Sequence, residues 1–330
     1  MFSKLISTSC SRNLFRALVL AAALLPLTAA TDKGYRYILT GNPDDAKVSP
    51  QGGFLLEGGA ADPEAAIRWM IKQSRGGDFL VLRASEEDDM HVSVPALGKV
   101  DSVETFIFDS SGPAYSPFVI EKIDQADAIF FAGGDQSEYV RFWKNTPVQA
   151  AVNRAIKRGV PVGGISAGLA ILGQFQFESM GEYVTPDYAL KDSYSSGITL
   201  GRDFLEISPL KGIITDTHFS QRNRLGRLMV FMARLLQDGW TSDAKGIGVD
   251  EETAVIVDNY GAARVTGKND AVFVRLLQKP LVCRPGEPLT AEAFEVVNVS
   301  DGQEFDIKTW KGGGRRSRVD VVNGVLKTMN

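Results

Sequence analysis

Cysteine and histidine are scarce in this chain, with two of each among its 330 residues. Cys10 lies in an N-terminal leader, so the rest of the chain keeps Cys283 alone and can form no internal disulfide. Two isolated histidines without a cysteine cluster provide no regular metal-ligand spacing, so no metal site is predicted. Core packing therefore has to stabilise the fold without covalent cross-links.

An excess of positive charge is lacking as well. The formal net charge is -4 at pH 7, which gives no reason to expect nucleic acid as a partner. The composition, 44% hydrophobic and 23% charged, is that of an ordinary globular protein. Because the sequence has no internal repeat, low-complexity linker or clear boundary, we predict a single domain over residues 31–330.

The N-terminal segment differs from the rest of the chain. Basic residues precede an apolar run at residues 17–27, and small residues follow at 28–30. This order is typical of a secretory signal peptide, and the run is too short to span a bilayer. We predict a signal peptide over residues 1–30 and a secreted protein, periplasmic or extracellular, without membrane contact after cleavage. An uncleaved N-terminal anchor is the alternative.

Short apolar runs alternate with amphipathic stretches along much of the chain. After a polar leader at residues 31–50, we predict strands at 52–59, 79–83, 105–108, 128–132, 160–162, 200–207 and 212–215, and helices at 64–73, 117–123, 147–158 and 221–237. Residues 174–196 have a loop-like composition, and from residue 245 onward the chain is mostly strand-like. This order predicts an α/β fold with a parallel sheet, whose sites form at the carboxyl ends of strands, and a β-rich C-terminal part.

A candidate nucleophile lies in PVGGISAGLA, residues 161–170, which contains the pattern G-x-S-x-G. Its serine, Ser166, falls between a predicted strand and a predicted helix, a turn that projects the hydroxyl group above the sheet. Gly164 and Gly168 remove side chains that would clash in so tight a bend. The N–H of Ala167 at the helix start would be one oxyanion donor. The alternative is a glycine-rich strand end with a purely structural role.

A serine nucleophile needs a general base, and His218 is the better of the two histidines. It follows the apolar strand at 212–215 and precedes the long helix, so it too lies at the carboxyl end of a strand. We interpret the other histidine, His91, as a surface residue. A lone histidine is more often structural than catalytic, so this prediction depends on the serine turn as well.

Three arginines, Arg222, Arg224 and Arg227, fall in the first turns of the predicted long helix. Cations at a helix N-terminus oppose the helix dipole and repel one another, which favours an anionic partner among them. A substrate carboxylate fits, because guanidinium groups bind carboxylates through two parallel hydrogen bonds. The alternative is an internal network of the arginines with Asp216, Glu178 or Glu182.

A glycine pair follows another predicted strand in FFAGGDQ, residues 130–136. Gly133 and Gly134 let the backbone approach a ligand closely, so the N–H of Gly134 or Asp135 is a candidate for the second oxyanion donor. Gln136 is then a candidate substrate contact. The absence of a following G-K-[ST] argues against a phosphate-binding loop.

The stretches PVGGISAG, FFAGGDQ, DTHFSQRNRLGR and GIGVDEETA resemble the serine exopeptidases that include cyanophycinase and peptidase E, the α-aspartyl dipeptidase. The similarity covers about residues 52–257, and the histidine stretch is closer to the cyanophycinases. It implies a flavodoxin-like three-layer sandwich related to class I glutamine amidotransferases, with serine in place of their cysteine. Ile165 and Thr217 depart from the family pattern, which usually has threonine and glutamine there.

The resemblance also implies a catalytic triad. Ser166 is the expected nucleophile and His218 the expected general base of an acyl-transfer mechanism that needs no metal or organic cofactor. In these enzymes an acid follows the serine at a short distance, which points to Glu182. Glu178 and Asp187 are the alternatives.

A substrate pocket is implied as well, formed by Gln136, Asp216, Arg222, Arg224 and Arg227. In cyanophycinases the substrate is a poly-aspartate backbone with arginine on its β-carboxyls, which is cleaved to β-aspartyl-arginine dipeptides. Arginines that bind carboxylates and acids that bind guanidinium groups suit such a substrate.

Other functions fit parts of the sequence. The specificity of an α- or β-aspartyl dipeptidase is compatible with the same residues. An α/β-hydrolase esterase has the same order of serine, acid and histidine, but this chain lacks its HGGG-type loop. A non-catalytic protein that captures acidic peptides with the arginine cluster is an alternative of another class. Dimerisation stays open.

Overall fold

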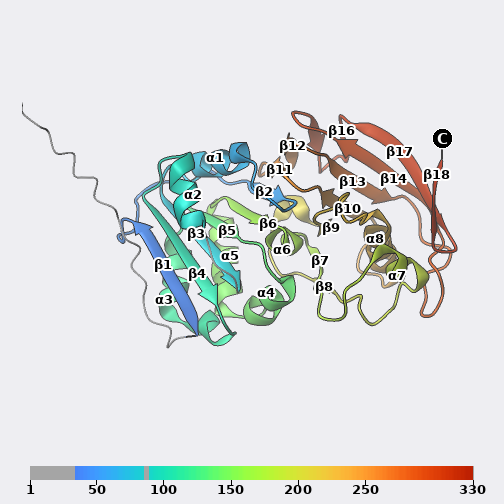
Figure 1. The fold of residues 1–330 in the computed structure, drawn as a ribbon, viewed down its shortest axis with the longest axis horizontal. Helices are drawn as coiled ribbons and strands as arrows, with labels where there is room; N and C mark the ends of the chain where they lie inside the picture. Colours follow the sequence, from blue (N-terminus) through green and yellow to red (C-terminus); the bar gives the residue numbers. More distant parts are fainter. Residues whose placement is uncertain (1–33, 85–88, 330) are drawn as a thin grey trace, which may run out of the picture.

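Two β-sheets form the framework of the protein in the computed structural model, which describes residues 34–84 and 89–329 (Figure 1). The predicted signal peptide at residues 1–30 lies outside the described residues. The larger sheet has the strand order β1-β4-β3-β5-β6-β2-β11-β12-β15-β16, and the smaller one β18-β17-β14-β13-β10-β9-β7-β8.

The central strands of the larger sheet run parallel. They are β4 (Ser102–Phe108), β3 (Asp78–Ala84), β5 (Ala128–Phe131), β6 (Val162–Ile165) and β2 (Phe54–Glu57). Nearly every residue of these strands is buried, as expected for a parallel sheet that is covered on both faces.

Helices cover both faces of this parallel core. Apolar side chains of α1 (Glu64–Gln73) and α2 (Met90–Leu97) pack on one face. Those of α3 (Pro117–Gln125), α4 (Gln136–Trp143) and α5 (Pro147–Arg158) pack on the other, together with the short helix η2 (Gly112–Tyr115). The predicted α/β class with three layers and parallel central strands is therefore confirmed.

Antiparallel strands extend the larger sheet at both edges. β1 (Tyr35–Gly41) pairs with β4, so the interpretation of residues 31–50 as a polar leader is wrong. Tyr35 and Tyr37 of β1 pack on Phe106, with ring centroids at 5.5 and 4.9 Å. At the other side, β2 is followed by β11 (Thr253–Val257), β12 (Ala262–Gly267), β15 (Glu304–Asp306) and β16 (Lys311–Gly312).

The smaller sheet combines strands from the middle and the end of the chain. The first of these are β7 (Phe175–Phe177), β8 (Leu200–Arg202), β9 (Ile213–Asp216) and β10 (Ala244–Val249). The rest are β13 (Ala271–Leu276), β14 (Ala291–Val299), β17 (Arg315–Val322) and β18 (Val325–Met329). Side chains of α7 (Pro186–Lys191) and α8 (Leu225–Gln237) pack against it. This sheet confirms the β-rich C-terminal part.

Several predicted boundaries shift. β6 begins two residues later than expected, and residues 174–196 contain β7 and α7 rather than loop alone. α8 begins at Leu225 instead of residue 221, because the backbone before it turns through positive φ at His218 and Asn223. Two short helices, α6 (Ala167–Ala170) and η3 (Ser208–Leu210), complete the described elements.

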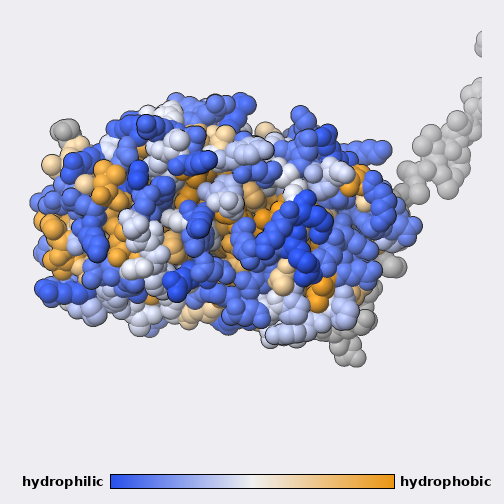
Figure 2. All heavy atoms as spheres, turned by 180° about the vertical axis from the view of Figure 1, so that it is seen from behind, coloured by the Kyte–Doolittle hydropathy of each residue, from blue (hydrophilic) through white to orange (hydrophobic). Residues whose placement is uncertain are grey.

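Figure 2 shows the face turned away in Figure 1, where hydrophilic side chains predominate and apolar patches lie between them. Within residues 34–84 and 89–329, no helix combines the length and the apolar character needed to cross a membrane. Cys283 is buried and forms no disulfide.

The contribution of the apolar core to stability can be tested at Trp143 in α4. It is fully buried, stacks on Tyr139 at 4.6 Å and meets Phe108 edge-on at 5.3 Å. We expect Trp143→Ala to lower the free energy of unfolding by about 3–5 kcal/mol, because it leaves a large cavity. Tyr260→Ala, at a site that is 86% exposed, is the control and should change it by less than about 0.5 kcal/mol. Equal urea midpoints for the two variants would contradict this account.

Candidate active site

Ser166 occupies a strained turn between β6 and α6. Its backbone has φ 53° and ψ -113°, which a non-glycine residue seldom adopts. The turn needs its two glycines: a Cβ atom on Gly164 would lie 2.5 Å from the carbonyl carbon of Gly168, and one on Gly168 would lie 2.0 Å from the carbonyl oxygen of Phe131. The sequence pattern thus places a partly exposed hydroxyl group at the carboxyl end of the parallel sheet.

His218 connects the serine to a carboxylate. The Oγ of Ser166 lies 2.8 Å from Nε2 of His218, and Nδ1 of the same ring lies 2.7 Å from Oε1 of Glu251. Near the centre of Figure 1, the strands β6 and β9 that precede Ser166 and His218 come together. The serine and histidine predicted from the sequence are therefore within hydrogen-bond distance, as a nucleophile and its base must be.

The ring environment decides the direction of the two hydrogen bonds. Burial lowers the pKa of His218 below its ordinary value of 6.5, and Arg222 and Arg224 lower it further, while Glu251 acts in the opposite sense. A neutral imidazole has one N–H, and the Glu251 carboxylate can only accept. Nδ1 therefore donates to Glu251, which leaves Nε2 free to accept the proton of Ser166.

The acid partner of His218 is not the one expected. The sequence resemblance predicts Glu182, but this residue is exposed. The Nδ1 atom of His218, which Glu182 would bind, contacts Glu251 instead. Glu178 forms an ion pair with Lys144 at 2.7 Å. Asp187 is an exposed residue in the first turn of α7. The carboxylate that His218 contacts is therefore Glu251 and not the expected Glu182.

Strand pairing explains the position of Glu251. β9 and β10 are parallel neighbours, with Asp216 opposite Gly248, so the residues that follow them meet at one edge of the smaller sheet. His218 follows β9, and Glu251 follows β10. The segment GIGVDEETA contained this signal: an acid just after an apolar strand, as for the serine and the histidine.

Three consecutive carbonyl groups at the end of β2 hold the backbones of this group. The carbonyl of Glu57 accepts from the N–H of Ser166 at 3.0 Å, and that of Gly58 accepts from His218 at 2.9 Å. The carbonyl of Gly59 accepts from Glu252, next to Glu251, at 2.9 Å. A Cβ on Gly59 would lie 2.2 Å from the ring of His218, so only glycine fits.

The two predicted oxyanion donors flank the serine. Ala167 is the first residue of α6 and directly follows Ser166. The loop Gly133–Gly134 approaches from the neighbouring strand β5, and a Cβ on Gly133 would lie 3.7 Å from Cβ of Ser166. Gly134 is exposed and has φ 141°, a conformation that suits glycine. The backbone of the Gly133–Gly134 loop therefore lies close to the side chain of Ser166.

Two of the three arginines belong to a buried network. Asp216 is 3% exposed and accepts from Nε of Arg227 at 2.7 Å, and Nη1 of Arg224 lies 3.4 Å from it. Burial raises the pKa of Asp216, but the two guanidinium groups outweigh this and hold it below its ordinary value. Arg227 is also 3% exposed. Asp216 and Arg227 therefore belong to the internal network that was the alternative prediction. Contrary to the expected substrate pocket, neither residue is free to bind a substrate.

Arg224 has a different position at the edge of this network. Its Nη1 also donates to the carbonyl and the hydroxyl of Thr217, at 2.8 and 3.0 Å. Its Nε is buried and has no hydrogen-bond partner among the described residues. The side chain is thus held in place by Asp216 and Thr217, and its Nε donor stays unused among the described residues.

The remaining predicted contacts are free. Arg222 is exposed, and its side chain forms no ion pair with any residue that the structure describes. Its charge nevertheless acts on His218. Gln136 is the first residue of α4, two positions after Gly134, and is partly exposed. An anionic group that reached Ser166 would therefore meet uncompensated positive charge.

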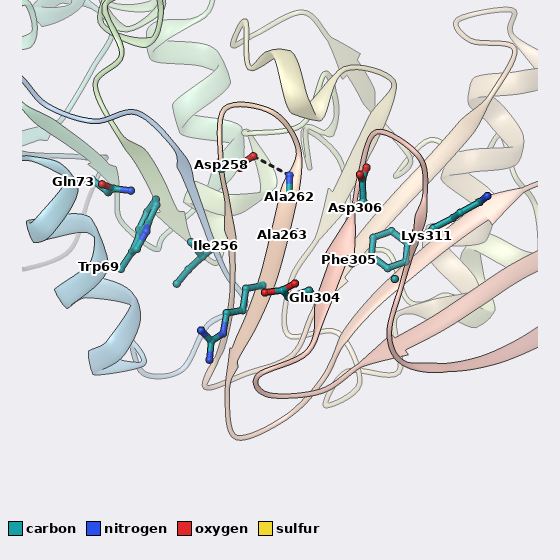
Figure 3. A pocket seen from close by; sticks show the side chains of 12 residues that line it. Trp69, Gln73, Ile256, Asp258, Ala262, Ala263, Glu304, Phe305, Asp306 and Lys311 are labelled. Atoms are coloured by element: carbon teal, nitrogen blue, oxygen red, sulfur yellow. Dashed lines mark hydrogen bonds between the residues drawn. The ribbon is translucent and has the colours of Figure 1, made fainter.

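A cavity of about 480 Å³ lies elsewhere, between α1 and the strands β11, β12 and β15 (Figure 3). Trp69 and Ile256 line it together with charged residues such as Glu304, and in Figure 3 the carboxylate of Asp258 accepts from the N–H of Ala262. No member of the Ser166 group lines it. The described residues also contain no group of three or more potential ligands that could hold a metal ion.

Ser166, His218 and Glu251 each follow the carboxyl end of a strand and are linked by hydrogen-bond contacts. This is the arrangement of a serine hydrolase. Residues 107–265 of this chain match the model of peptidase family S51. The predicted resemblance is confirmed, and the chain is related to this family.

Curated relatives cover part of the chain. A cyanophycinase of Trichormus variabilis is 28% identical over 190 residues, which are 56% of this chain and 58% of that protein. A cyanophycinase of Synechococcus elongatus is 25% identical over 215 residues, or 64% of this chain and 62% of that protein. The match thus spans less than two thirds of the length of either relative.

A solved structure supports the fold. The crystal structure of a peptidase from an acI-B1 Actinobacterium is similar with a TM-score of 0.54, over 78% of this chain and 98% of that one. The sequence identity is 16%, so the likeness concerns the α/β fold.

The two candidate acids can be separated by mutation. We expect Glu251→Gln to slow the labelling of Ser166 by a fluorophosphonate roughly 10²-fold or more, because the amide cannot hold Nδ1–H or stabilise the charged ring. Glu182→Gln is the matched control and should label at the wild-type rate. Mass spectrometry of the intact protein measures the labelling rate of each variant, so the test does not require the natural substrate. A slow Glu182→Gln variant beside a normal Glu251→Gln variant would restore the original assignment.

The pH dependence of labelling should reflect the pKa of His218. The reaction requires the neutral ring, so the rate falls as pH decreases through a midpoint below 6.5. Arg222 lowers this pKa, so Arg222→Gln should move the midpoint to higher pH, by less at high salt because Arg222 is exposed. Arg316→Gln, on β17 and paired with Glu295, should leave it in place. A midpoint that stays or falls in Arg222→Gln would contradict the assigned electrostatics.

Proposed function

We propose that the protein is a secreted serine peptidase that hydrolyses aspartyl or isoaspartyl peptide bonds. The observation that carries this proposal is the chain of hydrogen bonds from Ser166 through His218 to Glu251. The relation to peptidase family S51 supports it. Secretion rests on the signal-peptide pattern of residues 1–30.

The reaction would proceed through an acyl-enzyme. His218 takes the proton of Ser166 at Nε2 as Oγ attacks the carbonyl carbon, and the N–H groups of Ala167 and Gly134 stabilise the oxyanion. The protonated ring then gives its proton to the leaving amine, and the C–N bond breaks. Water, deprotonated by His218, releases the acyl group and restores Ser166. Glu251 stabilises the imidazolium in both steps.

Positive charge favours an acidic substrate. Arg222 has no ion pair in the described chain, and the Nε of Arg224 lacks a partner. An aspartyl carboxylate beside the scissile bond would provide two acceptors for such donors. Guanidinium groups in the substrate need an acid other than Asp216, because this residue is already bound to Arg227.

Cyanophycin is the substrate that we propose within this class, with β-aspartyl-arginine as the product. The two curated relatives described above carry the name cyanophycinase, and the chain contains the four stretches that carry the resemblance. An α- or β-aspartyl dipeptidase is the second candidate, because Thr217 replaces the glutamine usual in cyanophycinases and binds Arg224.

Release of β-aspartyl-arginine from purified cyanophycin tests the proposal, with Ser166→Ala as control and a panel of α- and β-aspartyl dipeptides beside it. Serine-dependent release from the polymer is the expected result. Cleavage of dipeptides alone would assign a dipeptidase. If neither is cleaved while acidic peptides still bind, the protein is a binding protein rather than a peptidase.

Arg222 provides a test of the charge argument. We expect Arg222→Gln to raise KM for an aspartyl substrate about tenfold, since a hydrogen bond to a charged group contributes about 1.5 kcal/mol or more. Hydrolysis of an uncharged activated ester, measured at a pH above the His218 midpoint, should be unchanged. Equal losses on both substrates would mean that Arg222 does not recognise the carboxylate.

A further inference from the structure

Glu57, the last residue of β2, carries a carboxyl group in an apolar layer. Its side chain is 0% exposed. Strand alternation places it on the same face as Leu55, which belongs to the apolar cluster under α1. The neighbours opposite Glu57 in the sheet are Ile165 of β6 and Ala254 of β11, both apolar. The side chain of Glu57 takes part in no step of the proposed reaction.

Asp62 is the side chain that Glu57 meets. Both oxygens of Glu57 and Oδ1 of Asp62 are buried and have no donor among the described residues. The two carboxyl groups nevertheless lie within hydrogen-bond reach of each other. Two carboxylates have no hydrogen to share, so the contact is favourable only if one of them carries a proton.

Glu57 is the group that carries this proton. Burial raises its pKa well above the ordinary value, and the charge and hydrogen bond of Asp62 raise it further. No cation enters this balance, and the nearby acid Glu64, at the start of α1, is exposed. A carboxyl group that is fully buried without a donor among the described residues is costly to ionise, so Glu57 favours its protonated form and donates to Asp62.

The contact between Glu57 and Asp62 joins the two ends of the segment 57–62, which supports the active site. The carbonyl of Glu57 itself binds the N–H of Ser166, and those of Gly58 and Gly59 bind His218 and Glu252. Asp62 follows three residues after Gly59, just before α1. A bond between the two side chains therefore fixes the first and last residues of the segment 57–62.

We propose that Glu57 is a positioning residue of the peptidase, which donates a hydrogen bond to Asp62 and so holds the segment 57–62 that aligns Ser166, His218 and Glu251. The proposal rests on the triad described above but not on the identity of the substrate. It implies that loss of the shared proton at high pH misaligns the site and slows the reaction.

Two substitutions separate positioning from simple stability. Glu57→Leu removes the donor, and we expect it to slow fluorophosphonate labelling roughly 10- to 100-fold, since small displacements of reacting groups have effects of this size. Its unfolding temperature should be equal or higher, because an apolar residue suits the layer. Glu57→Gln donates through its amide and cannot ionise, so it should keep the wild-type rate at neutral pH and lose less rate at alkaline pH.

The same labelling assay provides the control and the results that would overturn the proposal for Glu57. Glu64→Gln, an exposed acid of α1, should match the wild type throughout. A normal labelling rate in Glu57→Leu, or an unchanged alkaline decline in Glu57→Gln, would overturn the proposal. Labelling needs only Ser166 and its partners, so these outcomes are independent of whether cyanophycin is cleaved. Failure of the proposed substrate would leave the result for Glu57 standing.

Discussion

Three consecutive peptide carbonyls at the end of β2 hold the reactive side chains in register. Ser166, His218 and Glu251 follow three different strands, in two different sheets, and the segment Glu57–Gly59 forms hydrogen bonds with the backbone of all three regions. Its glycines allow the approach, because any side chain on Gly59 would collide with the ring of His218. The geometry on which acyl transfer depends is therefore set by main-chain hydrogen bonds, which substitution of surface residues does not disturb.

Charge is organised around this segment in two ways. Near His218, Asp216 pairs with Arg224 and Arg227, whereas Arg222 has no ion pair among the described residues. The positive charge of the arginines favours the neutral form of the His218 ring and suits an acidic ligand. At the end of β2, by contrast, the fully buried Glu57 meets the partly exposed Asp62, and this contact is favourable only if one of the two acids carries a proton. The first arrangement serves recognition and proton transfer, and the second fixes the backbone.

Local patterns and tertiary pairing contribute differently to what a sequence can predict. Ser166 and His218 could be found because each directly follows an apolar strand, and α1 was predicted to the residue. Glu251 was missed although it also follows an apolar strand, because only the parallel pairing of β9 with β10 brings it to His218. The same holds for Arg227, whose partner was one of three alternatives. The sequence of β1, YRYILTG, is rich in aromatic and aliphatic residues that favour a strand, which the interpretation of residues 31–50 as a polar leader overlooked.

The central claim is that Nδ1 of His218 donates its hydrogen to Glu251 and leaves Nε2 to accept from Ser166. The chain has only two histidines, so ¹⁵N NMR of labelled protein, with His91→Gln to assign the signals, can read the tautomer directly. At a pH where His218 is neutral, the account predicts a protonated Nδ1 and an unprotonated Nε2 in the wild type, and loss of this preference in Glu251→Gln. An Nε2–H tautomer in the wild type would contradict it.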